Sequence, residues 1–207
     1  MGKLMRPAIG VTVALWVLVG LLYPLVMTGV SNLLFPYQAQ GSPIYRHGQV
    51  VAAAHVGQYF GNAAGLFWGR PSATVSERTG KPKPYDALNS GASNLGPTTL
   101  ALMQHIQARV RRLERTDPGL TPARIPPDLV ESSGSGLDPD ISEQAALIQI
   151  PRVARATGLS RGFLTMLVQD NVKGPQWGLF GHPRVNVVAL NLELEQALAR
   201  IHPTARR

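Results

Sequence analysis

The N-terminal part of the chain contains one long apolar stretch. The 27 residues from Ile9 to Phe35 are almost all apolar, and the 39 residues from Pro7 to Tyr45 include no Asp, Glu, Lys or Arg. About 20 apolar residues in a helix cross a bilayer, so the pattern predicts one transmembrane helix over residues 7–35. Pro24 lies inside this stretch and is expected to kink the helix, because proline lacks a helical N–H donor and clashes with the preceding turn.

The basic residues beside this stretch predict its orientation. Lys3 and Arg6 precede it, and the next basic residue is Arg46. Because cytoplasmic flanks of membrane helices are enriched in Lys and Arg, we expect a short cytoplasmic N-terminus over residues 1–6. A linker over residues 36–45 and an extracytoplasmic, periplasmic domain over residues 46–207 would follow, in a single-pass protein.

A cleaved signal peptide is the alternative reading of the same stretch. The sequence Ala39-Gln40-Gly41 resembles a cleavage site with small residues at its first and third positions. The apolar region of a signal peptide, however, usually has about 7–15 residues, fewer than the stretch here. A retained anchor is therefore favoured.

The remaining 162 residues have the pattern of one mixed α+β domain. Pro97 is expected to open a helix in which Met103, Ile106, Val110 and Leu113 share one face. A strand at 49–56, loops at 72–94 and 118–127, and a helix at 159–172 are also expected. Asp140 and Glu143 have capping-box spacing and are expected to open a further helix, which Pro151 ends or bends. The C-terminal part is expected to contain a strand through Val185, Val187 and Ala189 and a final helix that is capped by Asn191 and contains Leu192, Leu194 and Leu198.

Composition excludes several classes of chemistry. Cysteine is absent, so there is no disulfide, thiol catalysis or Cys-ligated zinc. The five histidines, His202 among them, are isolated and show no zinc-binding spacing. Asp138, Asp140 and Ser142 alternate as in a calcium loop, but Glu143 stands where that loop requires glycine. No metal site is therefore predicted.

Two serines are weak candidates for a nucleophile. Ser93 follows Gly91-Ala92, but the glycine needed two residues after the serine is displaced to Gly96. Ser135 stands between Gly134 and Gly136, which is also the wrong spacing. A membrane-anchored periplasmic hydrolase that uses Ser93 or Ser135 is kept as an alternative function, and no catalytic residue is assigned.

The net charge of +8 comes from 20 basic and 12 acidic residues and raises the question of an anionic partner. His105, Arg109, Arg111, Arg112 and Arg115 gather on the helix expected after Pro97. No nucleic-acid-binding module accompanies them. We interpret this cluster either as a solvated helix face or as a contact with anionic lipid headgroups.

Seven sequence blocks together resemble one known family. The chain resembles the C subunits of the Kdp potassium-transporting P-type ATPases, over nearly its whole length. The matching blocks are Tyr23-Pro24, Val56-Gly57-Gln58 with Phe60, Trp68 to Ala73, Ser90 to Pro97, Ser133 to Pro139, Gln149 to Ala154, and Val185-Asn186-Val187 with Leu190-Asn191-Leu192.

The resemblance implies an accessory subunit of a bacterial inner-membrane complex for high-affinity, ATP-driven potassium uptake. The implied partners are a channel-like potassium-binding subunit, a P-type ATPase subunit and a small single-span subunit. They would handle potassium and hydrolyse ATP, and this chain would supply no catalytic residues of its own. This agrees with a span that has no ionisable residue, since intramembrane charges are typical of ion pathways.

The resemblance also implies a catalytic chaperone that raises the affinity of the pump subunit for ATP. The nucleotide-binding residues would be Ser133, Gly134, Ser135, Gly136 and Gln149. A third possibility, direct ATP binding by this chain, requires a cytoplasmic domain and so conflicts with the orientation predicted from Lys3 and Arg6.

Overall fold

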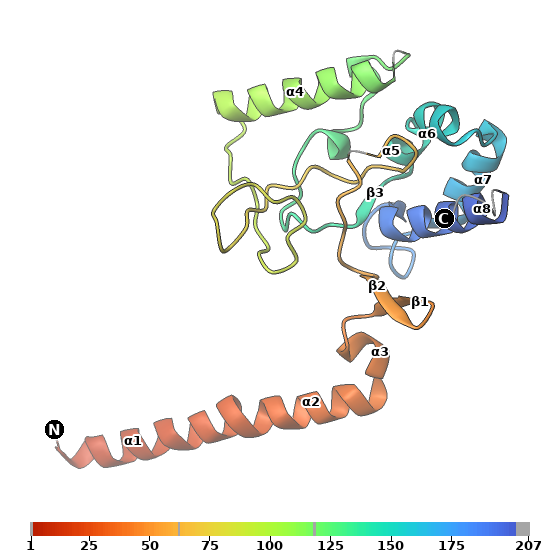
Figure 1. Ribbon diagram of the computed structural model, residues 1–207. Helices are drawn as coiled ribbons and strands as arrows, with labels where there is room; N and C mark the ends of the chain where they lie inside the picture. The colour runs from red at the N-terminus through yellow and green to blue at the C-terminus, as the bar shows by residue number, and fades with distance from the viewer. Residues whose placement is uncertain (1, 62, 118, 202–207) are drawn as a thin grey trace. The chain divides into compact units, whose positions relative to one another are not determined.

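The computed structural model describes residues 2–61, 63–117 and 119–201, so His202 and the start of the loop expected at 118–127 lie outside the described residues. The chain divides into two compact units, Met1–Ala53 and Ala54–Arg207. Figure 1 shows the elements of each unit. The fold is mixed α/β with one apolar helix at the N-terminus, as the sequence predicts.

The N-terminal unit begins with a nearly continuous helix. It consists of α1 (Gly2–Val17), a π-helical turn at Leu18–Leu22 and α2 (Tyr23–Leu34). The helix is long and apolar enough over Lys3–Leu34 to cross a membrane, with a mean hydropathy of 2.3 and no buried residue in its most apolar window. These properties are consistent with a membrane location.

Pro24 accounts for the π-helical turn. A proline inside a helix provides no N–H and clashes with the carbonyl four residues earlier, which here is that of Gly20. Gly20 lies in the middle of the turn Leu18–Leu22. Widening the helix there gives the ring room. The kink expected at Pro24 therefore takes the form of a local π-helical distortion.

A short helix and a β-hairpin follow the apolar helix. Helix α3 covers Pro36–Ala39, and strands β1 (Pro43–Arg46) and β2 (Gln49–Ala53) pair antiparallel. His47 and Gly48 both have positive φ angles, +50° and +77°, as two-residue hairpin turns require. Strand β2 was expected, whereas α3 and β1 lie in the segment expected to be a linker.

The second unit contains helices around a small sheet. The helices are α4 (Leu100–Thr116), α5 (Glu143–Leu147), α6 (Ile150–Thr157), α7 (Arg161–Asp170) and α8 (Val187–Ile201), with 3₁₀ turns at Pro122–Arg124 and Pro127–Leu129. The strands are β3 (Asp140–Ser142), β4 (Val172–Lys173) and β5 (Arg184–Asn186). They form an antiparallel sheet in the order β3-β5-β4.

Several predicted boundaries are wrong, and in each case a neighbouring side chain provides the cap. Asn186 accepts from the backbone N–H of Ala189 at 3.0 Å, so α8 begins at Val187 and Asn191 lies inside that helix instead of capping it. Ser142 caps α5, with Asp140 in strand β3. Pro151 does end the preceding helix, but it also occupies the first turn of α6, where proline is tolerated.

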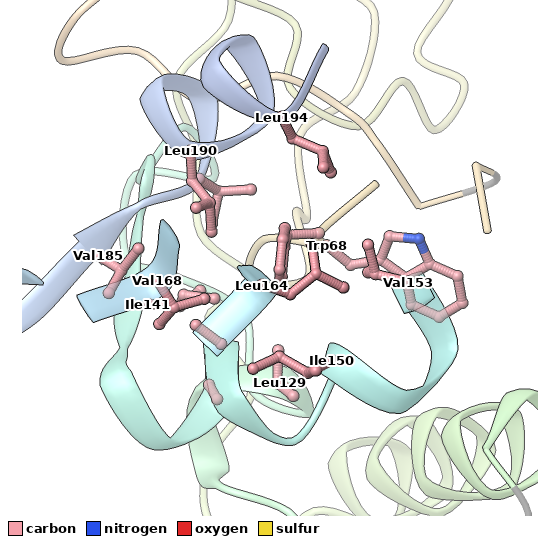
Figure 2. Close-up of a cluster of buried hydrophobic side chains, with 14 of the residues drawn as sticks. Trp68, Leu129, Ile141, Ile150, Val153, Leu164, Val168, Val185, Leu190 and Leu194 are labelled. Atoms are coloured by element: carbon pink, nitrogen blue, oxygen red, sulfur yellow. The ribbon is translucent and has the colours of Figure 1, made fainter. Parts of the chain in front are cut away.

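The core of the second unit is formed by apolar side chains from the helices and the sheet, several of them labelled in Figure 2. Val185 on the central strand, Val153 on α6, Leu164 on α7 and Leu190 on α8 are fully buried. Phe67 is also fully buried, although it belongs to no helix or strand. Side chains must therefore satisfy the backbone of the segment around Phe67.

Candidate functional site

Two side-chain amides bind the backbone of Phe67 and Trp68. Asn191 accepts from the Phe67 N–H at 2.8 Å and donates to the Phe67 carbonyl at 2.9 Å. Gln149 does the same for Trp68, at 2.8 and 3.0 Å. Each amide thus takes the place of a neighbouring β-strand and satisfies buried peptide groups.

Arg152 on α6 fixes the segment before Phe67. Its guanidinium donates to the carbonyls of Ala64 at 2.5 Å and Leu66 at 2.9 Å, and to the side chain of Gln149 at 2.6 Å. It also stacks on the Trp68 ring at 4.0 Å. Burial lowers the pKa of Arg152 to about 10, so the group remains charged at neutral pH. Within the described ranges no carboxylate lies within 4.0 Å of it.

Two arginines of α4 reach the same region. The Arg112 guanidinium lies over the Trp68 ring, 4.8 Å from its centre, and donates to the Gly61 carbonyl. Arg109 donates to the Val130 carbonyl at 2.6 Å and to Ser132 at 3.1 Å. Burial lowers the pKa of Arg109.

The prediction that these α4 arginines form a solvated face is wrong for Arg109, which is half-buried, whereas Arg112 is exposed as predicted. Arg109 lies three residues from Ile106 and four from Leu113, on the face that packs toward the core. The guanidinium groups of both arginines bind carbonyl oxygens of neighbouring loops, as long basic side chains often do.

A cavity of about 210 Å³ lies beside this cluster. Its lining includes Trp68, Tyr85, Arg70, Arg109 and Arg112. One carboxylate, Asp138, lies 3.3 Å from Arg70. Positive groups predominate, so the cavity suits an anionic group and disfavours a potassium ion.

The segment predicted to bind a nucleotide is built into the loops around this cavity. The Ser133 N–H donates to the Pro71 carbonyl at 3.4 Å, and the Ser135 carbonyl accepts from the Gly91 N–H at 2.8 Å. Gly136 has φ +68°, and a Cβ there would lie 2.5 Å from Thr74 Cγ2 and 2.6 Å from the Gly91 carbonyl. Gly134 and Ser135 are exposed.

Gln149, the remaining residue predicted to bind a nucleotide, is buried. Its amide oxygen accepts from Trp68 and Arg152, and its amide nitrogen donates to the carbonyls of Trp68 and Ala145. Gln149 and the loop Ser133–Gly136 therefore contact different parts of one segment, Phe67 to Thr74. The positioning roles of Asn191 and Arg152 were not predicted from the sequence. A polar residue inside an otherwise apolar helical stretch was the signal that marked Asn191.

The contacts do not support the serine-hydrolase alternative. The Oγ of Ser135 accepts from the Leu137 N–H at 3.1 Å. In the part of the chain that the structure describes, neither Ser93 nor Ser135 is hydrogen bonded to a histidine, and no group of three or more His, Asp or Glu side chains could hold a metal ion. A nucleophile with its general base is thus missing among these residues.

Comparison with known proteins agrees with the family resemblance. Residues 5–196 match the family described as "KdpC: K+-transporting ATPase, c chain". The potassium-transporting ATPase KdpC subunit of Methylobacterium nodulans is 50% identical over 198 residues, which cover 93% of this chain and 96% of the relative. Its counterpart in Rhodopseudomonas palustris BisB18 is 50% identical over 201 residues (94% and 98%), and that in Bradyrhizobium diazoefficiens is 47% identical over 200 residues (94% and 98%).

Proposed function

The chain belongs to the KdpC family of potassium-transporting ATPase c chains, and from this premise we propose that it is an accessory, non-catalytic subunit that assembles and activates the potassium-uptake complex. Its proposed partners are a channel-like potassium-binding subunit, a P-type ATPase subunit and a small single-span subunit. Its proposed location is the bacterial inner membrane, with the N-terminus in the cytoplasm and the second unit in the periplasm.

One observation supports an accessory role above all: the apolar helix carries no charged side chain that could line an ion path. The apolar helix has no Asp, Glu, Lys, Arg or His between Pro7 and Leu34, and ion pathways through membranes usually contain such residues. Three arginines, Arg70, Arg109 and Arg112, line the cavity beside Trp68, and their charge disfavours a cation there. Potassium is therefore handled by the partner subunits, and this chain acts on them through binding.

The contacts of the second unit support a role as a rigid binding partner. Its buried polar side chains, including Gln149, Asn191 and Arg152, are used to hold its own loops in place. A preorganised surface loses little conformational entropy on binding. We therefore propose that the apolar helix packs against membrane helices of the partners and that the second unit docks on their external surface.

The proposal is tested by expressing the other subunits of the complex with and without this chain. We expect deletion to abolish either co-purification of the subunits or their potassium-stimulated ATPase activity. A variant whose residues 3–34 are replaced by an unrelated apolar helix separates the contribution of the membrane helix from that of the second unit. Full assembly and full activity without the chain would contradict the proposal.

The family resemblance also implies that the chain raises the ATP affinity of the pump subunit, through Ser133–Gly136 and Gln149. Because Gln149 is buried and fully hydrogen bonded, its contribution to such an effect would be indirect, through the position of Trp68. Photolabelling of the complex with an azido-ATP distinguishes the alternatives. Label on this chain supports direct binding, and a chain-dependent shift of ATP affinity without label supports the indirect effect.

A further inference from the structure

The loop between β4 and β5 presents three large apolar side chains to solvent. Trp177 and Leu179 are each 81% exposed, and Phe180 is 60% exposed. Figure 1 shows this loop, which precedes α8 in the sequence, in pale blue below α8. Exposed apolar patches of this kind are typical of binding surfaces. We refer to residues Trp177–Phe180 as the aromatic tip.

The aromatic tip is a defined turn. The Gln176 N–H donates to the Phe180 carbonyl at 2.8 Å, and the Phe180 N–H returns a bond to Gln176 at 3.0 Å. The rings of Trp177 and Phe180 meet edge to face, 6.0 Å between centroids. Trp177 has φ +54°, a left-handed conformation that costs a non-glycine residue about 1–2 kcal/mol. Such strain at an exposed tryptophan is typical of functional sites.

Strand β5 links the tip to the first residue of the second unit. Three residues separate the tip from strand β5, and the last residue of the strand, Asn186, donates to the Ala54 carbonyl at 2.8 Å. Ala54 is the first residue of the second unit. The first residue of the second unit is therefore bound to the end of β5 that lies farther along the chain from the tip.

The flanks of the tip are basic. Lys173 and Arg184 are cross-strand partners at the end of the sheet, and His182 lies between the tip and Arg184. Between Asn171 and Arg184 there is no acidic residue. Arg184 is bound by Asp140 at 3.0 Å, whereas Lys173 is exposed. Because Asp140 already neutralises Arg184, Lys173 is the exposed cation at this end of the sheet that an external anion could approach.

We propose that the aromatic tip inserts into the headgroup region of the bilayer that anchors the chain, with Lys173 next to phospholipid phosphates. Trp, Phe and Leu at the tip with cations at its base form the side-chain pattern of interfacial membrane contacts. Anionic lipids attract nearby Lys and Arg side chains. The inference needs only an anchored chain, so it stands independently of the proposed role in potassium uptake.

The test uses the full chain in vesicles of phosphatidylethanolamine and phosphatidylglycerol, in which part of the lipid has brominated acyl chains. Subtracting the emission of a Trp177→Phe variant isolates Trp177 from Trp16 and Trp68. We expect the bromines to quench Trp177 emission. Leu179→Ser should remove most of this quenching, and Leu88→Ser, a change at a leucine that is 82% exposed elsewhere, should leave it unchanged.

Two further outcomes decide the proposal. Replacing phosphatidylglycerol by phosphatidylcholine should weaken the quenching, and Lys173→Gln should remove this lipid dependence; a Lys173→Gln variant that keeps the dependence overturns the headgroup contact. Trp177 emission that is quenched by aqueous iodide and untouched by brominated lipid overturns the insertion. So does protection of Trp177 that arises only when the partner subunits are added, since the tip would then bind protein.

Discussion

Gln149 binds Trp68 through both backbone groups of the tryptophan, at 2.8 and 3.0 Å, although 81 residues separate the two in sequence. The same amide oxygen accepts from Arg152 at 2.6 Å. Trp68, Gln149 and Arg152 therefore form one buried unit, and the removal of one member leaves the others with unsatisfied hydrogen-bonding groups.

Gln149→Ala should lower the free energy of unfolding by about 3 kcal/mol, because two backbone groups of Trp68 and one donor of Arg152 lose their partner in the interior. Denaturant unfolding of the full chain in detergent measures this. The matched control is Gln107→Ala on the exposed side of α4, which should change stability by less than about 0.5 kcal/mol. A Gln149→Ala variant of unchanged stability with lower ATP affinity of the complex would instead point to nucleotide binding.

Gly136→Ala should destabilise the second unit by about 3 kcal/mol, since the new Cβ combines a left-handed backbone with overpacking. It would lie 2.5 Å from Thr74 Cγ2 and 2.6 Å from a backbone oxygen, that of Gly91. Thermal unfolding provides the measurement. Gly134→Ala, two residues earlier in the same loop, has nothing within 4 Å of its Cβ and should be nearly neutral. Equal melting temperatures for the two variants would contradict this account of the loop.

Arg152→Lys should cost about 2 kcal/mol of stability and shift the emission of Trp68. A lysine ammonium keeps the charge but lacks the planar fork that reaches several carbonyls and stacks on the indole ring at 4.0 Å. Arg155→Lys is the control, because Arg155 is half exposed and pairs with Asp117 at 3.5 Å; surface pairs contribute about 0–1 kcal/mol. An Arg152→Lys variant as stable as the wild type would show that the fork geometry is unimportant.

The second unit should be accessible to protease from the periplasmic side. This follows from Lys3 and Arg6 before the apolar helix and from the absence of any basic residue between them and Arg46. Spheroplasts treated with protease should lose the second unit, while intact cells should retain it. Cleavage only after the inner membrane is lysed would reverse the orientation and remove the objection to direct ATP binding by the chain.

The local features of the fold were predictable because they depend on neighbours in sequence. The apolar helix, α4 and α7 follow from runs of apolar residues at helical or continuous spacing, and the break at Pro151 follows from the geometry of proline. Helix ends were less predictable, because several residues close to each end were able to cap it, as Ser142 does in place of Asp140.

The network around Trp68 was not predictable from the sequence, because its partners are distant along the chain and chemically ordinary. Asparagine is a common helix-capping residue, yet Asn191 lies inside α8 and binds the backbone of Phe67. Arg109 and Arg112 belong to a run of charges that usually indicates solvent exposure, yet they bind carbonyls of other loops. Only the packing of the core brings these residues together.

The pairing of Asn191 with Phe67 has a consequence for the order of folding. The two residues are 124 positions apart, so this contact closes a very long loop, and contacts of this kind form late. Until α8 has been synthesised, the buried peptide groups of Phe67 have no partner, and a chain interrupted before Asn191 lacks a completed core. We therefore expect a subunit that recognises the folded second unit to bind finished chains and to leave truncated ones unassembled.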